Sequence, residues 1–227
     1  MLFVPEGDFS LVAPLPGKRN QTPQRQAFHL SAFCIDRTEV PMSKWDSVKC
    51  GVPDRDCISD ASRRGPAVCI AEEQAECYCE KASSGWNARL PTDAEWLYAA
   101  LGSDGRKYPW GNDPYPAGLQ GRAPDFCSFE ARVPGSQTCA VDASTRDKGP
   151  FGVIGMGTNG FEMNGTCVTL EAAPKDGPYC LSRGMNHEGE VPPLAEQSLL
   201  HPSAASEPLS TNAVISFRCA TAERGRP

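Results

Sequence analysis

Cysteine is the residue type that offers most chemistry in this chain of 227 residues. Eleven cysteines could ligate a metal, react as thiols or form disulfides. Zinc sites favour CxxC pairs or tight Cys/His clusters, and the sequence has none. The spacing is typical of disulfides that clip loops in an oxidising compartment, although a reduced cytosolic protein stays open. The cysteines are Cys34, Cys50, Cys57, Cys69, Cys77, Cys79, Cys127, Cys139, Cys167, Cys180 and Cys219.

Proximity along the chain predicts three of the pairings. Each joins cysteines on either side of a short segment rich in Gly, Pro or Asp, where a turn brings the two ends together. The predicted bonds are Cys50–Cys57, Cys127–Cys139 and Cys167–Cys180.

Histidines and glutamates gather in one late segment. His187, Glu188, Glu190 and His201 lie within 15 residues, and two histidines with one carboxylate can hold iron. The surrounding tract is rich in Pro, Ser and Glu and shows no periodicity, which is typical of a solvated loop. We therefore interpret these residues as loop side chains and not as metal ligands.

Composition excludes several classes of protein. Hydrophobic residues make up 40%, too many for a disordered chain, and the length suits a single domain over residues 1–227. The formal charge of -6 and the lack of a basic run argue against nucleic-acid binding. No window is long and apolar enough for a membrane span.

The elements that must position any site are short. Gly and Pro number 21 each, which favours a loop-rich fold. Strands are expected at 1–12, 28–40 and 213–220, and near Val153, Val168 and Tyr179. Helices are expected at Met42–Val48, capped by Ser43, at Ala71–Ala82 and at Asp93–Leu101. The residues 191–212 are expected to form a long loop, and the four tryptophans to pack in the core or in turns: Trp45, Trp86, Trp96 and Trp110.

The third helix carries a more specific pattern. Thr92 and Glu95 have the spacing of a capping box, and the string "RLPTDAEWLYAA" from Arg89 is followed by "YPWG" from Tyr108. These strings resemble the central motif of the formylglycine-generating enzyme (sulfatase-modifying factor) family. Further blocks in family order resemble it too, including "FCIDRTEV" from Phe33, "PFGV" from Pro150 and "FRCA" from Phe217. The resemblance implies an α+β, C-type-lectin-like fold that is loop-rich.

The resemblance also implies one disulfide and one metal. In the family, the cysteine of the "YC" helix bonds that of the closing "FRCA" block, here Cys79 and Cys219. With this pair assigned, Cys34–Cys69 is predicted next, and Cys77 is left as a free thiol. The family binds calcium through a "GNxWEW" loop, here "TNGFEM", so structural calcium is predicted at Asn159 and Glu162. The alternative is that these two are ordinary turn residues.

The family activity needs residues that this chain lacks. Active members oxidise a substrate cysteine to formylglycine with a copper(I) ion held by two cysteines, and these lie between "RGGS" and the last strand. No cysteine stands between Cys180 and Cys219, so copper is not expected.

We therefore predict a divergent, non-catalytic, extracytoplasmic binding or structural module. Its ligand would be an unidentified protein, peptide or glycan, with residues 185–212 as the candidate surface. The chain starts inside the first family strand, so any leader would be absent from it. Two alternatives stay open: an active copper-dependent oxidase that uses other cysteines, such as Cys167 and Cys180, and a variable ligand-display protein.

Overall fold

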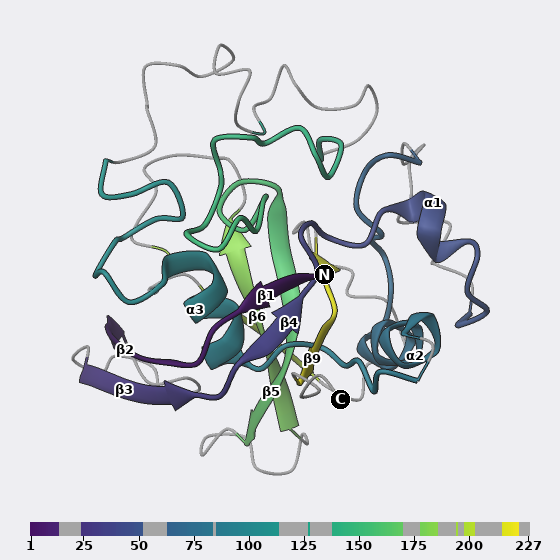
Figure 1. Cartoon of the computed structure of the whole chain (residues 1–227). Helices are drawn as coiled ribbons and strands as arrows, with labels where there is room; N and C mark the ends of the chain where they lie inside the picture. Colours follow the sequence, from purple (N-terminus) through teal and green to yellow (C-terminus); the bar gives the residue numbers. More distant parts are fainter. Residues whose placement is uncertain are drawn as a thin grey trace.

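The described part of the chain folds into three small sheets and three helices (Figure 1). The computed structural model describes residues 1–13, 24–51, 63–83, 85–113, 127, 138–169, 178–185, 194, 198–202 and 215–222. A four-stranded sheet has the order β7-β6-β5-β8, a three-stranded sheet the order β1-β4-β9, and β2 pairs with β3. The strands are β1 (Leu2–Val4), β2 (Gly7–Ala13), β3 (Gln24–Leu30), β4 (Phe33–Ile35), β5 (Gly160–Thr169), β6 (Pro178–Met185), β7 (Ser198–Pro202), β8 (Ile215–Phe217) and β9 (Ala220–Ala222).

The sheets bring the two ends of the sequence together. β4 lies between β1 and β9 and is antiparallel to both. β8 runs parallel to β5, and Cys219 lies between β8 and β9. The same short C-terminal segment therefore contributes one strand to each of two sheets and links them.

The helix α3 (Asp93–Leu101) is the centre of one hydrophobic core. All its residues from Glu95 to Leu101 are buried, as expected for a helix covered on every side. The predicted capping box is present: Thr92 Oγ1 accepts from the Glu95 N–H at 3.2 Å, and Glu95 Oε2 accepts from the Thr92 N–H at 2.7 Å. Gly149 packs against the end of this helix, where an added Cβ would lie 2.6 Å from the Ala99 carbonyl oxygen.

A second core lies between the other two helices and β8. It joins α1 (Met42–Trp45) and α2 (Glu72–Ala82) through an aromatic group. The Tyr78 ring stacks on Trp45 with a centroid distance of 5.6 Å and meets the edge of Phe217 at 5.5 Å. This packing holds α1 and α2 beside the segment that links β8 to β9.

Several predicted elements need correction. The strand expected at 1–12 is two strands separated by Pro5 and Glu6, and Val153 lies outside the strands. The helix α1 begins at Met42 as predicted, so its N-cap is Pro41 and not Ser43, and it ends at Trp45 and not at Val48. The prediction of a continuous loop over 191–212 is wrong, because β7 pairs with β6. β7 forms because its backbone pairs with β6. Its sequence does not predict a strand, because Leu199 and Leu200 are consecutive and do not alternate with polar residues.

Three of the predicted disulfides are confirmed by the structure. Cys79–Cys219, Cys127–Cys139 and Cys167–Cys180 are bonded in the structure. The predicted Cys50–Cys57 bond is wrong, because Cys50 bonds Cys77; Cys57 itself lies outside the described residues.

The predicted Cys34–Cys69 bond and the free Cys77 thiol are also wrong. Cys69 is disulfide-bonded, and Cys34 is the free cysteine among the described residues. Proximity in sequence misled the assignment because α2 carries Cys77 directly to Cys50 across the fold, with Cα atoms 5.8 Å apart. In the described part of the chain, no helix is long and apolar enough to cross a membrane.

Candidate functional site

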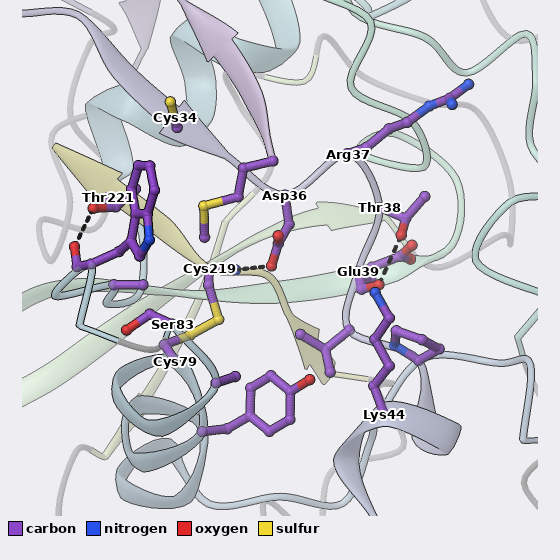
Figure 2. A pocket seen from close by; sticks show the side chains of 17 residues that line it. Cys34, Asp36, Arg37, Thr38, Glu39, Lys44, Cys79, Ser83, Cys219 and Thr221 are labelled. Atoms are coloured by element: carbon purple, nitrogen blue, oxygen red, sulfur yellow. Dashed lines mark hydrogen bonds between the residues drawn. A yellow bond between two sulfur atoms is a disulfide. The ribbon is translucent and has the colours of Figure 1, made fainter. Parts of the chain in front are cut away.

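A cavity of about 630 Å³ opens where β4, β9, α1 and α2 meet (Figure 2). Its volume lies within the range of roughly 300–1,000 Å³ that is usual for small-molecule sites. The end of β4 and the residues after it form one wall, α1 and the C-terminal half of α2 form the others, and β9 closes the cavity. The elements that surround the cavity are therefore far apart in the sequence.

The Cys79–Cys219 disulfide fixes one side of this cavity. It links α2 to the segment between β8 and β9, and both cysteines line the space. Asp36 is bound to the same segment twice: its N–H donates to the Cys219 carbonyl at 2.8 Å, and its Oδ2 accepts from the Cys219 N–H at 3.1 Å. The Asp36 carboxylate is thus held in place before any ligand arrives.

Three polar groups of different character line the cavity. Burial raises the pKa of Asp36, against the opposing effects of the Cys219 N–H and of nearby positive charges that include Lys44. Burial and then the Asp36 charge raise the pKa of Tyr78, so its hydroxyl stays protonated at neutral pH. The cavity therefore offers a carboxylate, an ammonium and a phenol.

The rim carries an exposed aromatic side chain. Trp86 lines the cavity with 54% of its surface exposed, which departs from the prediction that all four tryptophans pack in the core or in turns. Trp45 and Trp96 are buried as predicted, and Trp110 stacks on Tyr108 at 5.0 Å. An exposed tryptophan beside a cavity can contact the apolar part of a ligand.

The residues predicted to bind calcium lie outside the cavity and are occupied by other contacts. Arg218 donates to both carboxylate oxygens of Glu162, at 2.5 and 2.6 Å, and the Trp96 Nε1–H adds a bond at 3.0 Å. Asn159 Oδ1 accepts from the Cys139 N–H at 2.9 Å. A guanidinium already supplies the positive charge that calcium would bring, so these two side chains do not fit a calcium site.

Buried carboxyls form a cluster around this ion pair. Glu39 is 1% exposed, and neither of its carboxyl oxygens has a hydrogen-bond partner at normal hydrogen-bonding distance and angle in the described part of the chain. Burial first, and then the charge of Glu162, raise the pKa of Glu39 to about 8 despite nearby Arg218. Burial also raises the pKa of Asp147 to about 6, although Thr158 and the Gly157 N–H donate to it.

The cysteines that could replace the copper ligands are bonded to each other. Cys167 and Cys180 lie opposite one another on β5 and β6, and Glu72 Oε1 lies 3.7 Å from Cys167 Sγ. Two sulfurs and a carboxylate are thus grouped as they are in some metal sites. In the disulfide neither sulfur is a thiolate, and thiolates are the form that binds soft metals.

Most of residues 185–212, the surface predicted for ligand binding, lies outside the described residues. Of residues 185–212, the described ones are 185, 194 and 198–202. His187, Glu188 and Glu190 lie outside the described residues, and His201 is described only through the backbone of β7. The candidate site in the described part of the chain is therefore the cavity, which the sequence did not indicate.

Comparison with known proteins decides the family. The sequence profile of the sulfatase-modifying factor enzyme 1-like domain matches residues 1–223. The chain belongs to this family. The structure is similar to the crystal structure of CarF, with a TM-score of 0.63 and 18% identity over 98% of each chain. It is also similar to Treponema denticola variable protein 1, with a TM-score of 0.65 and 18% identity over 98% of this chain and 95% of that one.

These similarities establish the predicted α+β, loop-rich fold of the family. At 18% identity, the two solved structures speak to the fold alone. No curated protein sequence matches the chain.

Proposed function

We propose that this chain is a non-catalytic, extracytoplasmic binding or structural module built on the sulfatase-modifying-factor fold. The observation that carries the proposal is the state of its cysteines. No cysteine occurs between Cys180 and Cys219, and Cys167 and Cys180 are bonded to each other. In the described part of the chain Cys34 is the one free thiol, and a single thiol is not the pair that holds copper(I) in active members.

The proposed location rests on the disulfides. Four bonded pairs with both partners described, in a chain of 227 residues, suit a compartment that keeps cysteines oxidised. The proposed binding role rests on the cavity and on Trp86 at its rim, because loops and element ends held by a rigid scaffold are where such folds bind ligands. Structural calcium has no support at Asn159 and Glu162.

Copper binding and oxygen consumption test the proposal together. The oxidised protein, with its disulfides intact, is titrated with copper(I), and the oxidised and reduced forms are incubated with a peptide that carries the sulfatase cysteine motif. We expect no stoichiometric copper binding by the oxidised protein, because its bonded cysteines are not thiolates. We expect no peptide-dependent oxygen use by either form, because reduction frees only cysteines that lie outside the copper-binding segment of active members.

A Cys167→Ala variant serves as the control for metal captured by the reduced pair. Oxygen use that depends on the peptide, and that this variant loses, would restore the copper-dependent oxidase. Oxygen use that this variant retains would also overturn the proposal and place the copper ligands elsewhere.

A further inference from the structure

The cavity beside β4 combines opposite charges with apolar walls. Asp36 and Lys44 line it from two different elements, the residues after β4 and the helix α1. Figure 2 shows Arg37, another positively charged lining residue, extending away from the other lining side chains. The lining also includes Glu39, whose carboxyl is protonated at neutral pH because its pKa is raised to about 8, and Met1, whose amino group adds positive charge near Asp36. Asp36 and Lys44 are therefore the acidic and basic side chains that a ligand can pair with.

Both charged groups keep bonding capacity. Asp36 uses Oδ2 for the Cys219 N–H, while its Oδ1 accepts no hydrogen bond from the described residues. Within the same residues, the Lys44 ammonium makes neither a hydrogen bond nor a close ion pair, and it acts on Asp36 only through its field. Asp36 is half-buried and Lys44 is exposed, and each can form a charge-assisted hydrogen bond with a ligand group of opposite charge.

The remaining lining determines the body of the ligand. Val40, Ala82 and the Trp86 ring offer apolar surface, and Tyr78 offers a protonated hydroxyl. A purely cationic ligand would pair with Asp36 alone, and a purely anionic one with Lys44 alone. A ligand that is both positively and negatively charged can form a charge-assisted hydrogen bond with each of the two groups.

We infer that this cavity binds a small zwitterion with an apolar side chain, such as an α-amino acid or a dipeptide. Its ammonium donates to Asp36 Oδ1, its carboxylate accepts from Lys44, and its side chain packs against Trp86. The inference rests on the proposed binding role and specifies the chemistry of the ligand. Amino acid and dipeptide share this chemistry and differ in the spacing of their two charges.

Titration calorimetry on the oxidised full chain tests the inference with four probes. They are L-leucine, L-leucyl-L-leucine, leucine methyl ester and N-acetylleucine. We expect one of the two zwitterions to bind and to change the tryptophan fluorescence. We expect leucine methyl ester and N-acetylleucine to bind at least about tenfold more weakly than that zwitterion, because each of them loses one charge-assisted contact.

Variants assign each charge to its residue. Lys44→Met is expected to abolish the preference for the free carboxylate over the ester, and Asp36→Asn the preference for the free amine over the N-acetyl form. Asn retains an acceptor for the Cys219 N–H, so the local backbone is preserved. Lys81→Met is the matched control, because it removes a positive charge from an exposed position of α2 outside the cavity lining and should leave binding unchanged. Thermal unfolding verifies that each variant folds.

Two results would overturn the inference. One is saturable binding in which ester, N-acetyl compound and zwitterion are equivalent; the other is no binding of either zwitterion. A parallel panel of sugars, amines and carboxylates separates this failure from that of the proposed function. If a member of this panel binds and changes the tryptophan fluorescence, the zwitterion inference fails but the proposed binding function stands, with another ligand. Peptide-dependent oxygen use would instead contradict the proposed non-catalytic function.

Discussion

At the scale of single residues, the buried carboxyl of Glu39 is the most unusual group described. It lies near Glu162 and Arg218, and the Arg218 guanidinium already donates two hydrogen bonds to Glu162. Glu39 therefore stays protonated until the pH approaches about 8. Ionisation of Glu39 above that pH adds another negative charge beside Glu162, with which Arg218 is already paired.

Replacing Glu39 should change how stability depends on pH. The pKa of Glu39 rises from an ordinary 4.5 to about 8, so the folded protein holds this proton more tightly than the unfolded chain. The resulting stability is complete below about pH 4.5 and is lost as the pH rises through about 8. Glu39→Gln should flatten this decline and exceed the wild type at pH 9 by about 2–4 kcal/mol in free energy of unfolding.

Denaturant titrations at pH 5, 7 and 9 measure this effect on the oxidised protein. Glu80→Gln, an exposed position on α2, controls for the loss of one acidic residue. A variant whose decline between pH 5 and pH 9 matches the wild type would show that Glu39 does not titrate in this window.

At the scale of elements, sequence prediction was accurate where the residues of an element itself mark where it begins and ends. The bounds of α3 were predicted correctly because Thr92 and Glu95 begin it and Gly102 ends it, all within a dozen residues. β7 was missed because its partner strand, and not its own pattern, makes it a strand. The cavity was missed for a related reason: Asp36, Lys44 and Tyr78 meet only after α1 and α2 pack on β8.

The cap of α3 should be measurable in isolation. Thr92→Ala removes the acceptor of the Glu95 N–H, and we expect a loss of about 1 kcal/mol in free energy of unfolding. Thr92→Ser keeps the hydroxyl and should lose less than half of that amount. Equal losses for the two variants, measured by denaturant unfolding, would point to the Thr92 methyl group and not to the cap.

At the scale of the whole molecule, the Cys79–Cys219 bond has the largest span of the described disulfides. It joins residues 140 apart, whereas Cys127–Cys139 joins residues 12 apart. The chain-entropy account gives about 4–5 kcal/mol for the long loop and about 3 kcal/mol for the short one. The long-range bond also fixes the segment to which Asp36 is attached, so it stabilises the site as well as the fold.

Paired alanine variants compare the two bonds. Cys79→Ala/Cys219→Ala should lower the midpoint of denaturant unfolding more than Cys127→Ala/Cys139→Ala does, because it frees a longer loop. It should also weaken ligand binding in the cavity, which the other variant should leave intact. The reverse order of midpoints would mean that local packing around Cys127 and Cys139 outweighs loop length.

Two disulfides leave α2 from Cys77 and Cys79, two positions apart, and run in opposite directions along the sequence. Cys77 reaches back to Cys50 and Cys79 reaches forward to Cys219. A protease that cuts the backbone at any point between 79 and 219 therefore releases no fragment through that single cut, because both pieces stay covalently joined through Cys219. The chain can therefore be cut once between 79 and 219 while β9 stays covalently joined to the part of the chain that carries β1 and β4, the other strands of its sheet.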